Sequence, residues 1–83
     1  MNIKIYSTPS CVYCKMLKDY LSQKKVAFED INVATDHVAG REMVKKSGQM
    51  GVPVCIITTE NGKEEIIIGF DKAHISKLLG IKE

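Results

Sequence analysis

Residues 7–21 read STPSCVYCKMLKDYL and place two cysteines three positions apart where one sequence pattern gives way to another. Before this segment, apolar and polar side chains alternate, as they do in a half-buried β-strand. After it, apolar side chains recur at intervals of three and four, as they do along an amphipathic helix. A Cys-x-x-Cys pair at such a junction can serve as a metal site, a structural disulfide or a pair of reactive thiols.

The composition of the chain indicates one small globular domain over residues 1–83, with 45% apolar side chains. The net charge of +2 is too small to indicate nucleic acid or an anionic membrane as a partner. No apolar run approaches the ~18–20 residues of a membrane span, and the N-terminal MNIKIYS lacks the apolar stretch of a signal peptide. We therefore expect a soluble, cytoplasmic monomer.

The chain has three cysteines, Cys11, Cys14 and Cys55. A secreted disulfide scaffold usually carries an even and larger number. Because the cytoplasm is reducing, a Cys-x-x-Cys there is more often catalytic or metal-binding than a static cross-link. We therefore expect chemistry at Cys11 and Cys14. Cys55 is expected to be a small core residue, with a third redox thiol as the alternative.

The first half of the chain predicts a strand, a helix and a second strand. Residues 2–7 form the first strand, with Ile3 and Ile5 on one face. Ser10 is suited to cap the helix that follows. The inward stripe of that helix consists of Tyr13, Met16, Leu17, Tyr20 and Leu21. Residues 26–33 predict the second strand, and a unit of this length makes a right-handed parallel crossover. Its inward residues are Val26, Phe28 and Ile31.

A second helix is predicted over residues 37–48, with Asp36 as its N-cap and Gly48 as its C-terminal stop. The apolar residues of this helix are Val38, Ala39, Met43 and Val44. Its interior residue Gly40 costs ~1 kcal/mol relative to alanine. This helix is therefore weaker than the first.

A hairpin follows the second helix. Residues 52–58 and 64–69 predict two antiparallel strands. Asn61 and Gly62 suit the tight turn between them. The run Ile66–Ile68 fits a strand that is apolar on both faces, which indicates cover on both sides of the sheet.

Asp71 caps a last predicted helix, which ends at Gly80. Its apolar stripe consists of Ile75, Leu78 and Leu79. The predicted order is βαβαββα, which is an α/β fold. One parallel unit joins a hairpin, and three helices can flank a four-stranded mixed sheet.

The Cys-x-x-Cys pair falls at the start of the first predicted helix. Free backbone N–H groups and the helix dipole both stabilise an anion at Cys11, and Cys14 can donate its S–H to that anion. We expect Cys11 to be the exposed nucleophile and Cys14 to be less accessible, with the higher pKa. Cys11 attacks a disulfide, and Cys14 then attacks Cys11 and releases the reduced substrate. The protein is left with a Cys11–Cys14 bond and needs an outside reductant.

Two other uses of the pair stay open at this point. A zinc site usually needs four ligands, and Cys55 with His37 or His74 could complete a set with the pair. No second Cys-x-x-Cys and no closely paired histidines in the sequence support that set. A purely structural disulfide is the other alternative.

Three separated motifs together resemble the glutaredoxin branch of the thioredoxin superfamily. They are IYSTPSCVYCKMLKDYL at residues 5–21, MGVPV at residues 50–54 and IIIGFDKAHI at residues 66–75. The resemblance covers nearly the whole chain. It implies a thioredoxin-like fold with the sheet order 2-1-3-4 and the third strand antiparallel to the first.

The resemblance also implies a substrate site around the cysteine pair. In this family the proline at the position of Pro53 is cis and lies against the pair. The backbone of Val52 then pairs with an extended substrate segment like an added strand. Tyr13, which lies between the two cysteines, suits the rim of the site.

The turn before the last helix resembles the glutaredoxin segment that binds the γ-glutamyl end of glutathione, and it consists of Gly69, Phe70 and Asp71. Phe70 replaces the second glycine of that segment and could be a core residue or a partner contact. Thr8 stands where glutaredoxins typically carry a cation for a glutathione carboxylate, and Val12 replaces the proline of Cys-Pro-Tyr-Cys. The missing cation removes a contact worth ~1.5–3 kcal/mol, so glutathione is expected to bind weakly.

The sequence therefore predicts a dithiol–disulfide oxidoreductase with no bound cofactor. It resembles glutaredoxins. It also resembles the small redoxins that donate electrons to ribonucleotide reductase, which carry a Gly-Phe segment at the place of Gly69 and Phe70. Electrons are expected from glutathione or from a thioredoxin reductase, and the substrates are disulfide-containing proteins or glutathione mixed disulfides. One alternative is a metal or iron–sulfur binding module, with a cluster held between two protomers by Cys11 and glutathione. Another is a non-enzymatic adaptor that kept the fold.

Overall fold

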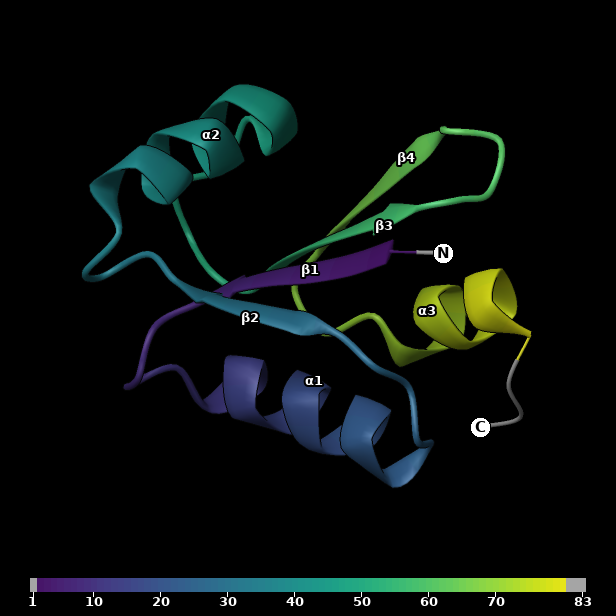
Figure 1. The fold of residues 1–83 in the computed structure, drawn as a ribbon. Coiled ribbons are helices and arrows are strands. Elements are labelled where there is room, and N and C mark those ends of the chain that lie inside the picture. The colour runs from purple at the N-terminus through teal and green to yellow at the C-terminus, as the bar shows by residue number, and fades with distance from the viewer. Residues whose placement is uncertain (1, 81–83) are drawn as a thin grey trace.

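The computed structural model describes residues 2–80 and arranges them as a four-stranded mixed sheet between helices (Figure 1). The elements in chain order are β1 (Asn2–Ser7), α1 (Val12–Gln23), β2 (Glu29–Asn32), α2 (His37–Ser47), β3 (Val54–Thr58), β4 (Glu64–Ile68) and α3 (Lys72–Leu79). The sheet order is β2-β1-β3-β4, in which β2 is parallel and β3 antiparallel to β1. The predicted βαβαββα order and the thioredoxin-like fold are confirmed.

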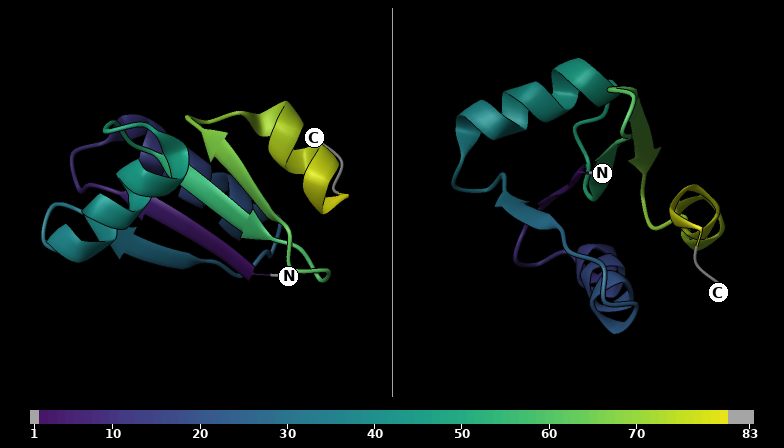
Figure 2. Two further views of the ribbon diagram at one scale, coloured as in Figure 1. Left: turned by 90° about the horizontal axis from the view of Figure 1, so that it is seen from above. Right: turned by 45° about the vertical axis from the view of Figure 1, so that its right-hand side comes forward.

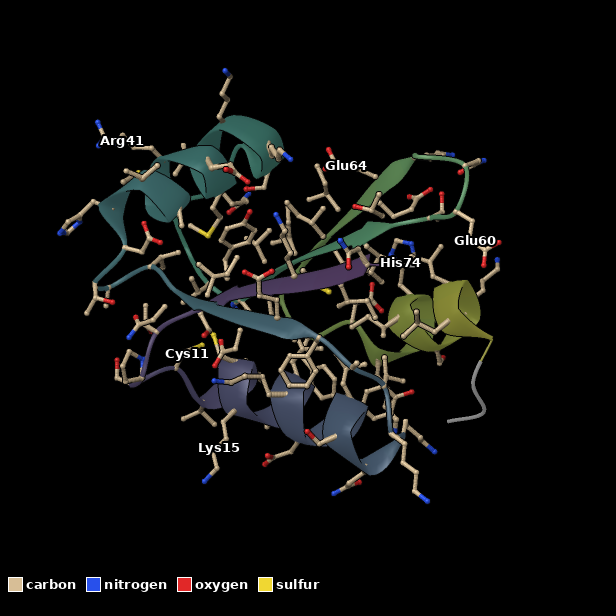
Figure 3. All side chains as sticks on the ribbon, in the orientation of Figure 1. Cys11, Lys15, Arg41, Glu60, Glu64 and His74 are labelled. Carbon is tan, nitrogen blue, oxygen red and sulfur yellow. The ribbon has the colours of Figure 1, made fainter. Side chains whose placement is uncertain are left out.

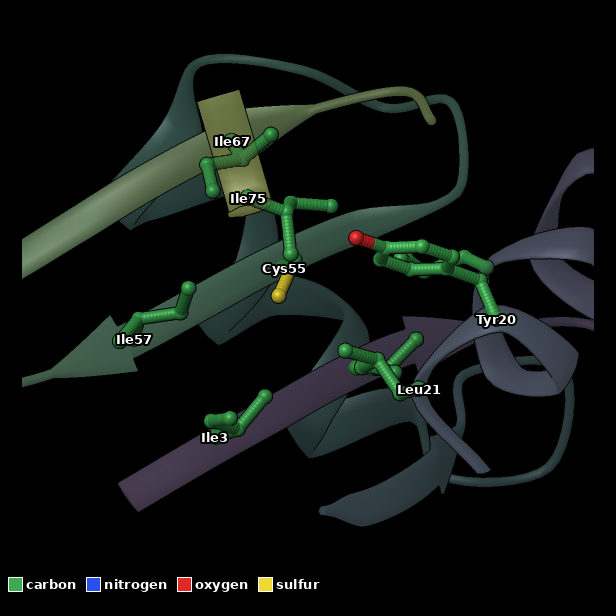
Figure 4. Packing of buried hydrophobic residues seen from close by; sticks show 9 residues of the cluster. Ile3, Tyr20, Leu21, Cys55, Ile57, Ile67 and Ile75 are labelled. Carbon is green, nitrogen blue, oxygen red and sulfur yellow. The ribbon is translucent and has the colours of Figure 1, made fainter. Parts of the chain in front are cut away.

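The helices divide between the two faces of the sheet, with α2 on one face and α1 and α3 on the other (Figure 1 and Figure 2). Each face has its own cluster of buried side chains. The cluster on the side of α1 and α3 contains Ile3, Ile5, Leu17, Tyr20, Leu21, Cys55, Ile57, Ile67 and Ile75 (Figure 4). The cluster on the side of α2 contains Tyr6, Met43, Val54 and Ile56. Neighbours along β3 alternate between the clusters because successive strand side chains point to opposite faces.

The two later helices begin and end as predicted. The Asp36 carboxylate accepts a hydrogen bond from the Ala39 N–H at 3.0 Å, and the Asp71 carboxylate accepts one from the His74 N–H at 3.1 Å. α2 ends at Gly48, whose φ of 72° is a left-handed conformation that favours glycine. No helix among residues 2–80 has the length and apolar content needed to cross a bilayer.

α1 differs from the prediction at its first turn. Its N-cap is Cys11 rather than Ser10, because the Cys11 sulfur accepts the backbone N–H of Cys14. The prediction that Tyr13 and Met16 face the core is wrong, since the two residues are 63% and 45% exposed. Cys14 takes the inward place in this turn, because a thiol buries as readily as a small apolar side chain.

β2 is shorter than the strand predicted over residues 26–33. Only Glu29–Asn32 pair with β1. The Val26 N–H instead donates to a carbonyl of α1 at 2.9 Å and so closes the end of that helix. Val26 and Phe28 still pack against the cluster under α1 and α3, whereas Ile31 packs against the cluster under α2. The inward positions are thus confirmed although most of these residues lie outside the strand or at its end.

The hairpin strands are also shorter than predicted. β3 starts at Val54 rather than at Val52, because Pro53 has no N–H to donate to the sheet. β4 ends at Ile68, since Gly69 turns the chain with a φ of 77°. This turn leads directly to the cap of α3.

Some side chains that the pattern places inward are exposed. Ile66 packs on the α2 side and Ile67 on the opposite side, as predicted, but Ile68 is half exposed because β4 is an edge strand. Val38 and Val44 of α2 are exposed as well. The reason is that α2 buries only one narrow face against the sheet, which leaves part of its apolar stripe in solvent.

Gly40 gives a test of how much α2 depends on its sequence. A Cβ atom at Gly40 would lie 3.7 Å from the Val33 Cβ, which is ordinary contact, so the fold does not require glycine there. Gly40→Ala is therefore expected to raise the free energy of unfolding by ~0.5–1 kcal/mol, because alanine is the better helix former. Urea unfolding followed by circular dichroism measures the change.

The matched control is Gly48→Ala, at the left-handed position that ends α2. There a Cβ atom is strained, so the same chemical change is expected to lower the free energy of unfolding by about 1 kcal/mol. Equal effects of the two substitutions would contradict this assignment of the two glycines.

Candidate active site

The cysteine pair lies where the chain leaves β1 and enters α1. Cys11 has an extended backbone, with φ −86° and ψ 113°, and its N–H donates to the Thr8 carbonyl at 3.2 Å. The Cys11 sulfur accepts the Cys14 N–H at 3.1 Å. An N-cap side chain commonly bonds the N–H three residues later. The Cys-x-x-Cys spacing is therefore the spacing of an N-cap and the residue whose N–H it accepts.

The surroundings of Cys11 supply hydrogen-bond donors to its sulfur. The first turn of a helix carries N–H groups without helical partners and the positive end of the helix dipole. Cys11 is partly exposed at this end of α1, so a substrate disulfide can reach it (Figure 3). Lys15 is exposed and extends away from the molecule (Figure 3), so the helix backbone rather than this lysine surrounds the sulfur.

Cys14 differs from Cys11 in both exposure and acidity. Its side chain is fully buried. Burial, followed by its hydrogen bond to Cys11, raises the pKa of the Cys14 thiol to about 11. Cys14 is therefore a neutral thiol near neutral pH. Both cysteines are free thiols in the structure, so they form the reduced state of the pair.

The segment before β3 approaches the cysteine pair. The Val52–Pro53 peptide bond is cis. The Val52 carbonyl accepts a long hydrogen bond from the Cys11 thiol, with 3.7 Å between sulfur and oxygen. The Pro53 carbonyl accepts the Gly69 N–H at 2.9 Å. The structure thus brings Cys11, Val52, Pro53 and Gly69 together from three separate loops.

The other predicted site residues lie around this group. Tyr13 is exposed on the first turn of α1, as a rim position requires. The Phe70 ring packs on the Tyr20 ring, with 5.9 Å between centroids, and belongs to the core side of α1 and α3. Asp71 is the N-cap of α3. Their contacts with a substrate stay predictions.

A polar network beside the pair is absent from the sequence-based prediction. The buried Ser7 hydroxyl donates to Asp30 at 2.6 Å, and the Lys18 ammonium donates to the same carboxylate at 3.0 Å. Burial raises the pKa of Asp30, but the hydrogen bonds from Ser7 and Lys18 outweigh it and hold the pKa below its ordinary value. The positive charge of Lys18 also lowers the pKa of Cys14, against the larger effect of burial. The feature of the sequence that could have indicated this network is Ser7, a polar residue at the end of the first predicted strand.

A glutaredoxin family model matches residues 3–61 of the sequence. The chain belongs to the glutaredoxin family. A glutaredoxin-like 8.6 kDa protein in the rubredoxin operon of Clostridium pasteurianum is 49% identical over 77 residues, which cover 93% of this chain and 96% of that protein. A mutant of the thioredoxin-like protein BC3987 superposes with a TM-score of 0.85 and 27% identity, covering 98% of this chain and 97% of that one. The NrdH-redoxin of Escherichia coli superposes with a TM-score of 0.72 and 29% identity, covering 94% and 95%.

The third cysteine of this glutaredoxin lies in the core. Cys55 is fully buried on β3, among side chains of α1, α3 and β4 (Figure 4). The zinc ligand set considered from the sequence, Cys11, Cys14 and Cys55 with His37 or His74, is not assembled among residues 2–80. Within residues 2–80, no three His, Cys, Asp or Glu side chains gather as metal ligands.

Cys55 should make the stability of this glutaredoxin fall at alkaline pH. Burial raises the pKa of the Cys55 thiol from 9.0 to about 12. The stability that the buried neutral Cys55 thiol contributes is therefore fully present below the pKa of this thiol in the unfolded chain. It is lost as the pH rises towards the pKa in the folded protein, because the unfolded chain releases the proton first. The expected loss is roughly 1.4 kcal/mol for each pH unit in that interval.

The Cys55→Ala variant removes this loss and keeps every other titrating group. Urea unfolding across the alkaline range should therefore show a shallower fall in the free energy of unfolding for Cys55→Ala than for the wild type. Parallel pH profiles of the two proteins would show that Cys55 is not a buried neutral thiol.

Proposed function

We propose that this member of the glutaredoxin family is a dithiol–disulfide oxidoreductase in which Cys11 is the nucleophile and Cys14 the resolving thiol. One observation carries the proposal. The Cys11 sulfur is the partly exposed N-cap of α1 and accepts the Cys14 N–H at 3.1 Å, while the Cys14 side chain is fully buried behind it. The two sulfurs therefore have the unequal access that the two steps need.

In the first step, the Cys11 thiolate attacks one sulfur of a substrate disulfide. The substrate S–S bond breaks, the second substrate sulfur leaves as a thiolate and takes up a proton, and a mixed disulfide forms on Cys11. In the second step, Cys14 loses its proton and attacks the Cys11 sulfur. The remaining substrate thiol leaves, two electrons have passed to the substrate, and the protein holds a Cys11–Cys14 disulfide.

Val52 is proposed to hold the backbone of a protein substrate. Its carbonyl lies 3.7 Å from the Cys11 sulfur, and Val52 precedes the first residue of β3 by two positions. An extended segment can therefore pair with Val52 as an added strand and present its disulfide to Cys11. Pro53 fixes the direction of this backbone, and Tyr13 and Gly69 border the same place.

We propose that a thioredoxin reductase, rather than glutathione, restores the dithiol. Thr8 supplies no cation for a glutathione carboxylate. The Phe70 ring is used in packing against Tyr20. The similar NrdH-redoxin of Escherichia coli is described as having a thioredoxin-like activity profile. The substrates are then disulfide-containing proteins, reduced by a monomer in the cytoplasm.

The experiment compares two electron sources for the oxidised protein, with cystine as the disulfide. One assay contains NADPH and thioredoxin reductase, and the other contains NADPH, glutathione and glutathione reductase. NADPH oxidation is expected to be faster in the first assay. Turnover with glutathione alone would overturn the proposed electron source, and no turnover in either assay would overturn the oxidoreductase itself and favour an adaptor.

A further inference from the structure

A cavity of about 690 Å³ lies along α2, and neither cysteine of the pair lines it. Its apolar lining consists of Val33, Gly40, Met43, Val44 and Met50. We call this surface, with the charged residues described below, the α2 groove. It runs from the end of β2 along one side of α2 to the loop that follows the helix.

Two apolar side chains of the α2 groove are exposed without any contribution to the core. Met50 is 85% exposed and Val44 is 38% exposed. Exposed apolar side chains that gather in a hollow are typical of interaction surfaces.

Gly40 lines the α2 groove opposite Val33. A Cβ atom at this residue would point towards Val33 across the groove, at 3.7 Å from the Val33 Cβ. Glycine weakens the interior of a helix relative to alanine, and no steric contact in the fold requires it here. A larger side chain at this position would therefore occupy part of the groove.

The charged side chains of the α2 groove are all potential cations, namely His37, Arg41 and Lys45. Neither Arg41 nor Lys45 forms an ion pair among residues 2–80, whereas the adjacent Lys46 pairs with Glu42 and Glu64. Arg41 extends from α2 away from the sheet (Figure 3). The groove therefore offers an apolar floor beside unpaired positive charges.

We propose that the α2 groove binds an acidic amphipathic helix of a partner protein. Residues 37–45 span about 12 Å along α2, which is the length of two helical turns. Apolar side chains at helical spacing would fill the floor, and glutamate or aspartate beside them would pair with Arg41 and Lys45. The groove is open to solvent, so it would leave a small ligand largely in water, whereas small-molecule sites enclose most of their ligand.

The position of the α2 groove links this partner to the redox site. Met50 precedes Val52 by two residues, and the Val52 carbonyl lies 3.7 Å from the Cys11 sulfur. A protein held in the groove is therefore close enough to bring a disulfide or a dithiol to Cys11. This extension rests on the proposed function, but binding in the groove does not.

The test uses a synthetic peptide of about 14 residues, long enough to form a helix on binding, with leucines at helical spacing and glutamates elsewhere. A matched peptide carries lysine in place of every glutamate. Each is titrated into the isotope-labelled, reduced protein while the backbone amide shifts are recorded. The acidic peptide is expected to give saturable shifts at Val33, at residues 37–45 and at Met50, and the lysine peptide none.

Three variants locate the binding. Lys45→Glu is expected to weaken the Kd about fivefold, because a surface ion pair becomes a repulsion. Lys77→Glu makes the same change of charge on α3, at the other face of the sheet, and should leave the Kd unchanged. Gly40→Leu fills the groove and should weaken the Kd about tenfold or more. If Gly40→Leu fails to fold, the surface pair Lys45→Glu and Lys77→Glu still decides the result.

Equal binding of the two peptides, shifts outside the α2 groove, or equal weakening by Lys45→Glu and Lys77→Glu would each overturn the proposal. Tighter binding to phosphatidylglycerol vesicles than to the acidic peptide would overturn the class of partner. All three variants should reduce cystine at the wild-type rate. If the oxidoreductase proposal fails, the wild type itself will not reduce cystine. If only the groove proposal fails, the wild type will reduce cystine but will not bind the acidic peptide in the α2 groove.

Discussion

Cys11→Ser is expected to lower the rate of disulfide reduction on the order of a thousandfold or more. A serine hydroxyl does not ionise near neutral pH, and it cannot form a mixed disulfide with a substrate sulfur. The fold should survive, because serine is among the preferred N-cap residues and its oxygen can accept the Cys14 N–H as the sulfur does. NADPH oxidation coupled to cystine reduction measures the loss, and circular dichroism checks the fold.

Cys55→Ala is the control for this loss. It removes a thiol that is fully buried on β3 and outside the cysteine pair. Its rate of cystine reduction should remain within about twofold of the wild type, since the substitution removes one buried sulfur and leaves Cys11, Cys14 and the helix N-terminus in place. A Cys11→Ser variant that turned over, or a Cys55→Ala variant that did not, would move the nucleophile from Cys11 to Cys55.

Cys14→Ser is expected to stop the reaction after its first step. Cys11 keeps its place at the N-terminus of α1 and still accepts the backbone N–H of residue 14, so it still attacks a disulfide. The mixed disulfide then has no internal thiol to release it. With an aromatic disulfide reagent that liberates a coloured thiol, the wild type should liberate both halves of the reagent, whereas Cys14→Ser should liberate one half and retain the other.

The mass of the protein shows the retained half directly. A dithiol added afterwards should release it and restore the free mass, as expected for a disulfide on Cys11. Release of both halves by Cys14→Ser would mean that another thiol resolves the intermediate. The double variant Cys14→Ser, Cys55→Ala then identifies Cys55 as that thiol or excludes it.

The pH dependence of resolution follows from the same burial. The pKa of the Cys14 thiol is raised to about 11, first by burial and then by its hydrogen bond to Cys11. In the mixed disulfide Cys11 is no longer a titrating thiol, and burial is the cause that still raises the Cys14 pKa. Only the thiolate attacks, and its fraction grows as the pH rises towards that raised pKa. The second step is therefore expected to accelerate as the pH rises above neutral, until the contribution of Cys14 ionisation saturates.

Local features of the fold could be predicted because neighbouring residues decide them. The caps at Asp36 and Asp71 depend on a side chain and an N–H three positions away, and both occur as predicted. The N-cap of α1 was missed because two adjacent residues, Ser10 and Cys11, can both accept such a bond. Only the direction in which the chain leaves β1 selects the second of them.

The ends of strands and the exposure of apolar side chains could not be predicted locally. Only four residues of β1, Lys4–Ser7, pair with β2. Residues before Glu29 therefore do not form a strand, although apolar and polar side chains alternate there as well. Met16, Val44 and Met50 are apolar like core residues, but no element among residues 2–80 covers them, so they are exposed. Burial is decided by tertiary contacts, which sequence periodicity does not contain.

In the candidate site, too, contacts between nearby residues could be predicted from the sequence, whereas contacts between distant residues could not. Cys11 and Cys14 are three residues apart, and their spacing and position indicate redox chemistry directly. Val52 approaches Cys11 from 41 residues away, and only the resemblance to a family placed it there. The contact between Ser7 and Asp30, 23 residues apart, has no motif at all and was missed.

The cap geometry of Cys11 has a consequence for Val12 and Tyr13, the two residues between the cysteines. They occupy the first two positions of α1, their side chains are exposed, and the sulfur is held by the backbone N–H of residue 14 rather than by either of them. The identity of this dipeptide can therefore change while the two sulfurs keep their arrangement. The backbone N–H that holds the sulfur and the two exposed side chains are thus separate parts of the same four-residue segment, so substitutions of Val12 or Tyr13 are expected to leave the hydrogen bond at Cys11 in place.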